Sequence, residues 1–388
     1  MPVHDVVRLD PAGGPAPVTA TARALLDAAA ACEGDVAPVV AALTGDDASD
    51  PTGRGSAAPS ARPALDLPLT GEGRTREQWE LLASVAAVDL SAARVLEPHL
   101  DALSILSQAG VPAPAGLLGV YASESGGRTP AVTREQGTGS EAADVAAWRL
   151  DGEKPWCSLA DTCAHAVVTG TDAGGVRHAL LVDLRHPGVT PVDTAWPALG
   201  LAPITTVGLR FDAVPGTPVG EGEWYLTRPG FAWGGIGVAA VWFGGAVHIA
   251  RTLRSQVERR AAAAAEGSGP GPDQIGLAAL GRVDRLLHAM AALLARAAED
   301  VDAGRLDHGL GMVEADRIRG TVAQLCTEVV DVVGQATGPG PLTADAAHAR
   351  AVADLQVYLR QHHGHRDDAR LAEALLAAGA DAEGLRTW

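Results

Sequence analysis

The period of the hydrophobic pattern changes twice along this chain of 388 residues. Apolar residues recur at helical spacing up to about residue 117, in short alternating runs over 118–230, and at helical spacing again over 231–388. A helical face needs a period near 3.6 and a strand face a period of 2, so no single repeating architecture accommodates all three parts. The pattern predicts a mainly α chain. Its parts would be an N-terminal helical domain (1–117), a small antiparallel β-domain (118–230) and a C-terminal four-helix bundle (231–388).

The two helical domains carry recognisable boundaries. We expect a long helix over 75–108, capped by Thr75 with Gln78 as its capping-box partner. The stretch 46–62 is rich in Gly, Pro, Ser and Asp, which indicates a connecting loop. In the C-terminal domain, apolar stripes separated by Gly/Pro-rich turns predict four long helices, the last over 343–376.

The middle domain contains a strong turn signal. Asp151-Gly152 lies between apolar flanks in the run from Trp148 to Trp156. An Asp-Gly pair in that setting predicts a β-hairpin.

Composition excludes several classes of function. The 47 acidic residues outnumber the 30 basic ones, for a net charge of -17, and such a surface repels nucleic acid. No uncharged apolar run of about 18 residues is present, so we expect no membrane span. The first residues lack a signal-peptide pattern. The four cysteines are too few and scattered for a disulfide framework, which favours reduced thiols in a cytoplasmic protein.

Several motifs that suggest a cofactor or metal have simpler interpretations. Gly235-Ile-Gly237-Val-Ala-Ala240 matches G-x-G-x-x-A, but no strand precedes it, so close helix packing is favoured. Cys157, Cys163 and His165 lack the paired spacing of a zinc site, and we expect no metal. A G-x-S-x-G elbow and a P-loop are both absent from the sequence.

Two further features have both a functional and a structural interpretation. The cluster His362-His363-Gly364-His365 could exchange protons near neutral pH, although composition alone favours a solvated helix end. Trp156 stands two residues before Ser158, and an indole with a nearby hydroxyl can hold a flat conjugated ligand. Core filling is the default for any one of the eight tryptophans.

The domain order, together with local motifs, resembles the acyl-CoA dehydrogenase superfamily. Its members combine an N-terminal helical domain, a middle β-domain and a C-terminal four-helix bundle. Lys154-Pro-Trp156-Cys-Ser158 is similar to the family segment G-x-K-x-W-I-T/S. The resemblance implies that the Trp156 ring lies against a flavin and that the Ser158 hydroxyl bonds the flavin ring system.

A second flavin-binding stretch is implied by the resemblance. Tyr121-Ala-Ser123-Glu-Ser125-Gly-Gly127 takes the place of the family's T-E-P-x-x-G-S. Tyr121 and Ser123 are therefore candidate flavin-binding residues, and Ser123 stands for the family's threonine. Ser125 replaces the proline, which is a departure from the family pattern.

The bundle carries the motif by which relatives hold the other half of the cofactor. Gln335-Ala-Thr-Gly338 resembles the Q-x-x-G-G turn that contacts the adenine half of FAD in a neighbouring subunit. The resemblance thus implies FAD, binding roles for Gln335 and Gly338, and a homodimer or homotetramer. Relatives also bind the pyrophosphate with an arginine upstream of Gln274. The corresponding run, 261–267, has no arginine, which implies weakly bound FAD or a diffusible flavin.

The resemblance also selects a candidate catalytic base. Relatives carry a glutamate early in the bundle, near Gly234 or Gly235 here, or in a late E-G-T turn. Aligning Arg350-Ala-Val-Ala-Asp354 with the family's R-x-x-R-D puts the late position on His362. His362 is therefore the predicted catalytic residue.

The implied activity is α,β-dehydrogenation of an acyl thioester by a flavin-dependent oxidoreductase, with an electron-transfer partner. A base removes the α-proton while a hydride passes to the flavin. Because both glutamate positions are replaced, two alternatives stay open. One is a monooxygenase of the same superfamily, supplied with reduced flavin by a reductase. The other is a non-redox protein that has kept the fold.

Overall fold

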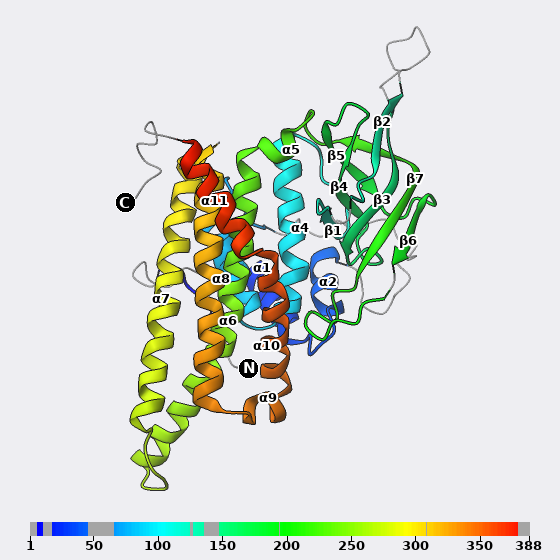
Figure 1. Ribbon diagram of the computed structural model, residues 1–388. Helices are drawn as coiled ribbons and strands as arrows, with labels where there is room; N and C mark the ends of the chain where they lie inside the picture. The colour runs from blue at the N-terminus through cyan, green and yellow to red at the C-terminus, as the bar shows by residue number, and fades with distance from the viewer. Residues whose placement is uncertain are drawn as a thin grey trace.

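The computed structural model describes residues 6–10, 18–45, 66–124, 127–135, 147–193, 195–307 and 309–378. These residues form a helical body with a β-domain beside it (Figure 1). Helices come first along the chain, then seven strands, then helices again, so the predicted fold class is confirmed. The domain boundaries at 117/118 and 230/231 stay predictions, and the predicted loop over 46–62 lies outside the described residues.

The first helices are α1 (Ala20–Ala30), α2 (Ala37–Thr44), α3 (Thr75–Ala86) and α4 (Leu90–Ala109). The single helix expected over 75–108 is wrong, because α3 ends at Ala86 and Asp89 starts a new helix. Its side chain accepts a hydrogen bond from the Ala92 amide at 2.8 Å and caps α4. Thr75 does not cap α3 either. It lies inside the first turn, and its hydroxyl bonds the carboxylate of Asp302 on a distant helix.

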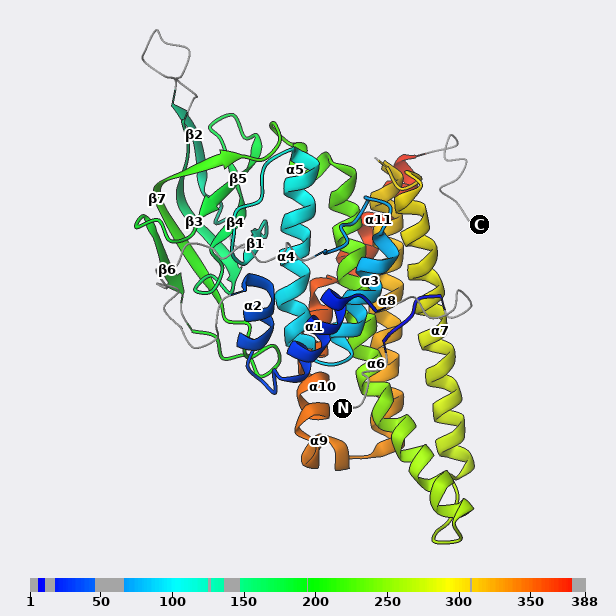
Figure 2. The same cartoon turned by 180° about the vertical axis from the view of Figure 1, so that it is seen from behind.

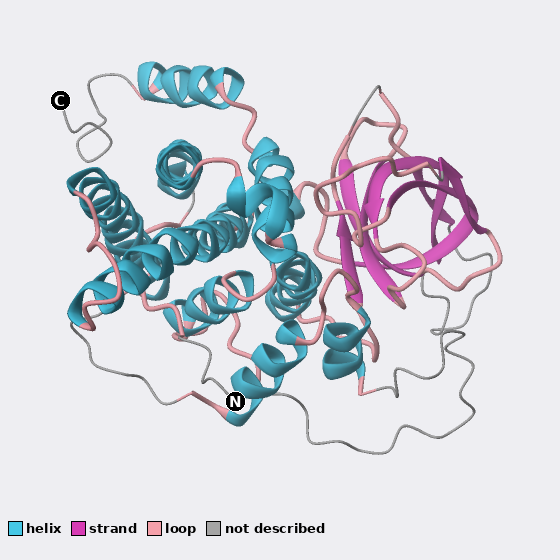
Figure 3. Cartoon of the chain, turned by 90° about the horizontal axis from the view of Figure 1, so that it is seen from below, coloured by secondary structure: helices cyan, strands magenta, loops and turns pink. Residues whose placement is uncertain are grey.

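The strands are β1 (Leu118–Tyr121), β2 (Ala131–Glu135), β3 (Ala147–Ser158), β4 (His165–Thr171), β5 (Arg177–Asp183), β6 (Val189–Asp193) and β7 (Thr206–Pro218). The order β4-β2-β3-β7-β5 closes on itself, because β5 also pairs with β4. Figure 3 shows these strands curving into a ring beside the helices. The pairings are antiparallel except β1 with β4 and a short β2–β4 contact, which are parallel.

The hairpin predicted at Asp151-Gly152 is wrong, because β3 continues straight through it. β2 pairs with β3 on one side and β7 on the other, so the chain has no room to turn back. The register shifts between Leu150 and Gly152, and Gly152 has φ +116°. The Asp-Gly pair therefore marks a β-bulge inside a long strand.

The C-terminal helices are α5 (Trp224–Thr227), α6 (Pro229–Ala265), α7 (Gln274–Asp302), α8 (Gly309–Thr337), α9 (Gly340–Ala344), α10 (Ala346–Tyr358), the 3-10 turn η2 (Leu359–Gln361) and α11 (His365–Ala377). The last helix, expected over 343–376, is instead broken. Gly364 has φ +57°, which turns the chain between η2 and α11. The long helices α6, α7 and α8 run side by side, and α10 lies against α6 (Figures 1 and 2).

Helix α6 is the centre of the helical body. In the described part of the chain it is the one helix long and apolar enough to cross a membrane, and 72% of its most apolar window is buried inside the fold. Gly244 permits close approach of α3, since a Cβ there would lie 2.2 Å from the Ala83 carbonyl oxygen. The burial and this close approach identify α6 as a core helix.

The interior of the β-domain contains an unusual buried cation. Lys154 has no exposed surface, and its Nζ donates to Thr169 Oγ1 at 2.8 Å. Burial lowers the pKa of Lys154 to about 8. Trp156, two residues further along β3, is exposed instead, because the strand register shifts between Lys154 and Cys157.

Candidate functional site

Two of the predicted flavin-contacting residues touch each other at the end of the barrel. Tyr121 ends β1 and donates its hydroxyl to the carbonyl of Ser158, the last residue of β3, at 3.0 Å. The Ser158 hydroxyl lies 3.0 Å from Thr206 Oγ1, and Arg94 of α4 donates to it at 3.4 Å. Thr206 gives its own proton to the Ile204 carbonyl. The Ser158 proton is therefore directed to Thr206 or to a ligand.

Trp156 presents its indole to the outside at the same end of β3. Its side chain is half-exposed, at 54%, and its φ is +60°, while the flanking Cys157 is buried. A large residue held in the left-handed region is strained, and such strain persists only where the surroundings impose it. Core filling is thus not the role of Trp156, and an exposed ring suits contact with a flat ligand.

The remaining flavin-binding candidate on β1 is less constrained. Ser123 lies two residues past the end of β1 and is exposed. Ser125, which replaces the family's proline, lies outside the described residues.

A charged stripe on α4 starts at the Ser158 hydroxyl. Arg94, Glu97 and Asp101 are three and four residues apart, which places them on one helix face. Glu97 pairs with Arg94 at 3.4 Å and accepts the Tyr358 hydroxyl at 3.0 Å. Burial raises the pKa of Tyr358 far above its usual value, and Glu97 adds to this rise, so the hydroxyl keeps its proton and donates.

Asp101 ends the stripe beside the start of α6. Its Oδ1 lies 3.9 Å from the Arg228 guanidinium, which itself donates to the Gln108 side chain at 2.8 Å. A Cβ built on Gly234 would lie 2.8 Å from the same Oδ1. Burial raises the pKa of Asp101 to about 6, and Arg228 opposes that rise. The sequence gives no carboxylate at position 234, yet the structure brings one there from α4.

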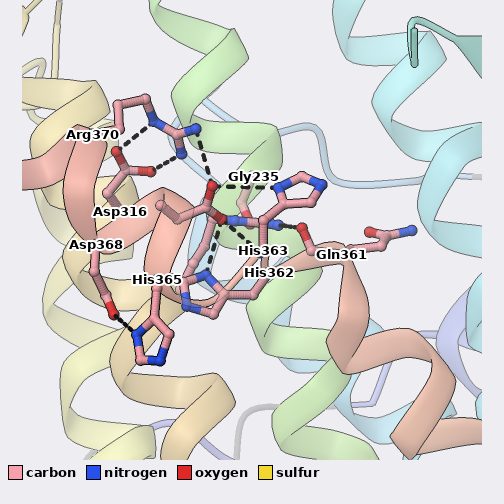
Figure 4. A network of polar contacts seen from close by, with 10 residues as sticks. Gly235, Asp316, Gln361, His362, His363, His365, Asp368 and Arg370 are labelled. Atoms are coloured by element: carbon pink, nitrogen blue, oxygen red, sulfur yellow. Dashed lines mark hydrogen bonds and ion pairs between the residues drawn. The ribbon is translucent and has the colours of Figure 1, made fainter. Parts of the chain in front are cut away.

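Arg319 of α8 joins this region to the histidine turn. It donates to the Gly235 carbonyl at 2.6 Å and to the Gln361 carbonyl at 3.1 Å (Figure 4). Its guanidinium also lies 4.9 Å from the centre of the buried Trp242 ring. Arg319 thereby fixes the turn that precedes His362 against α6.

The histidine turn is organised by one carboxylate, that of Asp367. His362 Nδ1 lies 3.1 Å from one Asp367 oxygen and His363 Nδ1 lies 3.3 Å from the other, with the rings on opposite sides (Figure 4). Despite burial, the His363 amide and Arg370 hold the pKa of Asp367 below its usual range. The His362 side chain is only 11% exposed. Its other ring edge faces α8, since a Cβ on Gly320 would lie 3.5 Å from it.

The solvated-helix-end interpretation fits part of the histidine cluster. His363 is 63% exposed and His365 is fully exposed, whereas His362 is held in place. Within the described ranges, no hydrogen bond or ion pair joins His362 to Tyr121 or Ser158. Arg319 lies over the Trp242 ring, Trp242 contacts Tyr358, and Tyr358 donates to Glu97 of the charged stripe.

Gln335 and Gly338 lie apart from the Ser158 end of the barrel, at the C-terminal end of α8. Gln335 is exposed and lines a groove of about 520 Å³. A second groove of about 780 Å³ passes His362 and shares Gln324, Thr327 and Arg360 with the first. Gly338 has φ +65° and ends α8 as its C-cap.

Free space at the Ser158 end is small. The cavity lined by Arg94, Pro98, Tyr121 and Ser158 among others has a volume of about 10 Å³, enough for little more than one water molecule. A cavity of about 920 Å³ lies between α1, α3 and the end of α7. None of the predicted site residues lines it.

Sequence reasoning missed the charged stripe on α4. The acidic and basic residues of 94–101 stand at helical spacing in the sequence. Nothing local in the sequence shows that Tyr358 of α10 and Arg228 before α6 face these side chains, so the sequence predicts no site there.

No family model and no curated protein matches the chain. Solved structures do match it along most of its length. KijD3 in complex with FMN and dTDP-3-amino-2,3,6-trideoxy-4-keto-3-methyl-D-glucose has 20% identity and a TM-score of 0.68, covering 96% of this chain and 98% of its own. FMN-bound TdsC from Paenibacillus sp. A11-2, described as a dibenzothiophene monooxygenase, has 14% identity and a TM-score of 0.68, covering 92% and 98%.

A dehydrogenase matches equally well. Butyryl-CoA dehydrogenase from Megasphaera elsdenii has 15% identity and a TM-score of 0.68, and the match covers 93% of this chain and 100% of that one. The structural matches show a shared fold over 92–96% of the chain, and at these identities they show the fold alone.

Proposed function

Because the chain has the acyl-CoA dehydrogenase fold, we propose that it is a flavin-dependent monooxygenase acting on a polar small molecule. The observation that carries this proposal is the charged stripe on α4. Arg94 donates to the Ser158 hydroxyl, and Asp101 lies beside Gly234, close to the position at which the resemblance implies a catalytic glutamate. Burying an acyl chain against these charges would cost free energy, whereas a polar substrate can bond with them.

The two family positions for a catalytic glutamate also depart from the dehydrogenase pattern. Position 234 is a glycine, and the late position is His362, whose Nδ1 faces Asp367. The carboxylate beside Gly234 comes instead from Asp101 on α4, which pairs with Arg228 at 3.9 Å.

The residues at the barrel end fit a flavin ring system. Trp156 offers an exposed aromatic face and Ser158 a hydroxyl that Arg94 positions. Reduced flavin, when bound, supplies the electrons that activate dioxygen. No arginine stands in 261–267 to hold a pyrophosphate, which favours FMN or weakly held FAD. The FMN complexes of KijD3 and TdsC support the same choice.

We further propose that the protein is a cytoplasmic homo-oligomer supplied with reduced flavin by a separate reductase. A diffusible flavin requires such a supply. Gln335 and the connected grooves along α8 would face the neighbouring subunit.

The test begins with the purified full-length chain and FMN. We expect FMN binding, no anaerobic bleaching of the flavin by a panel of acyl-CoA esters, and oxygen consumption with product formation when reduced FMN is supplied. The substrate panel contains nucleotide-linked amino sugars and aromatic heterocycles. Anaerobic bleaching by an acyl-CoA would instead establish a dehydrogenase. Failure to bind any flavin would leave a non-redox protein with this fold.

A further inference from the structure

We propose that Asp101 is the acid–base residue of this site, taking a proton from the bound substrate in place of the carboxylate that the sequence lacks at Gly234 and Gly235. This inference rests on the proposed function and assigns a role that the sequence motifs do not. The substrate it implies carries an ionisable N–H or O–H group at the reacting end.

The Asp101 carboxylate fills the space beside Gly234. Its Oδ1 would lie 2.8 Å from a Cβ on Gly234, so a side chain at position 234 would require the Asp101 side chain to move. Glycine at this position therefore leaves room for a carboxylate that reaches the start of α6 from α4.

No donor of the protein forms a hydrogen bond with the Asp101 carboxylate in the described residues. Within the described ranges it makes no hydrogen bond, and its single ion pair, to Arg228, is long at 3.9 Å. Glu97, one turn earlier, is already bonded to Arg94 and Tyr358. The Asp101 side chain is 23% exposed, so water or a ligand can reach it and supply the missing donors.

The groups around Asp101 place its carboxyl in a mixed charge environment. Glu97 on α4, Tyr225 on α5 and Arg228 before α6 are the titratable groups that face Asp101. Burial raises the pKa of Asp101 to about 6, Arg228 lowers it and Glu97 raises it. A group poised near neutral pH can both accept and release a proton during turnover.

The step balances without any other reactant. The substrate N–H or O–H bond breaks, its electron pair stays on the substrate atom, and the proton forms an O–H bond with the Asp101 carboxylate. After the product leaves, Asp101 returns the proton to water.

The test compares Asp101→Asn with Asp284→Asn, an exposed aspartate on α7, in the FMN-loaded full-length protein. We expect Asp101→Asn to lower substrate-dependent kcat by about 100-fold or more, with FMN affinity unchanged. The acidic limb of the pH profile should disappear in this variant alone, and Asp101→Glu should restore part of kcat. Unchanged kcat with the acidic limb retained would overturn the proposal.

A second measurement needs neither substrate nor flavin. The pH-difference infrared spectrum of the wild-type chain should show a carboxyl that titrates near pH 6, missing in Asp101→Asn and present in Asp284→Asn. Its absence from the wild type overturns the role of Asp101. If the carboxyl titrates as expected but no compound of the panel is oxygenated, the proposed function fails while the proton-exchanging group stands.

Discussion

At the scale of single residues, the site rests on a few side chains held against their ordinary preferences. Trp156 is exposed and has its backbone in the left-handed region, and Asp101 is recessed without a hydrogen-bond donor from the protein. Such positions lower stability and are retained where function needs them. One substitution can remove the backbone strain at Trp156, and another the recessed charge at Asp101. We expect each to keep or raise stability while it lowers ligand binding or activity.

Trp156→Gly tests the first of these residues. Glycine adopts the φ of +60° without strain, so we expect the melting temperature to stay equal or rise. Loss of the indole should weaken FMN binding about tenfold or more. Trp156→Phe, which keeps an aromatic face, should retain most of the affinity. Fluorescence titration and thermal unfolding provide both readouts, and unchanged FMN affinity in the glycine variant would remove Trp156 from the site.

Asp101→Asn tests the second residue through stability. The folded-state pKa of Asp101, about 6, lies above its usual value of 3.8. Its favourable contribution is thus complete below pH 3.8 and is lost as pH rises through about 6. At pH 7.5 the asparagine variant should be more stable by at most about 3 kcal/mol, and the difference should shrink toward pH 4. Urea unfolding at several pH values measures it; a pH-independent difference would contradict the assignment.

At the scale of elements, the sequence predicts whether a segment is a helix or a strand better than it predicts where the element begins and ends. The 3.6-residue stripes predict helices in the regions that became α3, α4 and α6–α8. The hairpin at Asp151-Gly152 fails because β2 and β7 pair with β3 on both sides, and β7 lies about 50 residues further along the chain. The helix over 343–376 fails because Gly364 and the contacts of Arg319 with Gln361 favour a turn.

Helix crossing at Gly244 makes a prediction at this scale. Gly244→Ala should destabilise the fold by about 1–3 kcal/mol, because its Cβ would meet the Ala83 carbonyl at 2.2 Å and force α3 away. Gly281→Ala is the matched control, since nothing lies within 4 Å of its Cβ on α7. There alanine should stabilise by about 0.8–1 kcal/mol through helix propensity. Chemical denaturation compares the two, and equal effects would refute the crossing argument.

At the scale of the whole molecule, the order of helices, barrel and helices could be read from periodicity because it depends on local pattern alone. The site could be read only in part. Trp156 and Ser158 lie two residues apart on one strand, and their pairing is visible in the sequence. The meeting of Asp101 with Gly234 depends on how α4 crosses α6, which no local pattern encodes.

The proposed oligomer also gives a prediction at this scale. The end of the α6–α7 pair extends beyond the rest of the molecule (Figure 1), and α7 begins there with Ile275 79% and Leu277 49% exposed. Covering such side chains favours association, which must offset repulsion between chains of charge -17. Ile275→Glu with Leu277→Glu should therefore reduce the mass measured by light scattering. Leu376→Glu on α11 serves as control, and an unchanged mass would place the interface elsewhere.

Burial of Lys154 inside the barrel has a practical consequence for bioconjugation. It is the only lysine in the sequence, and its ammonium has no exposed surface. Amine-reactive dyes, biotin esters and cross-linkers should therefore find a single accessible amine on the folded chain, the α-amino group. Mass spectrometry should show one adduct per native chain and a second only after unfolding, so that ester labelling serves both as a site-specific handle and as a record of barrel opening.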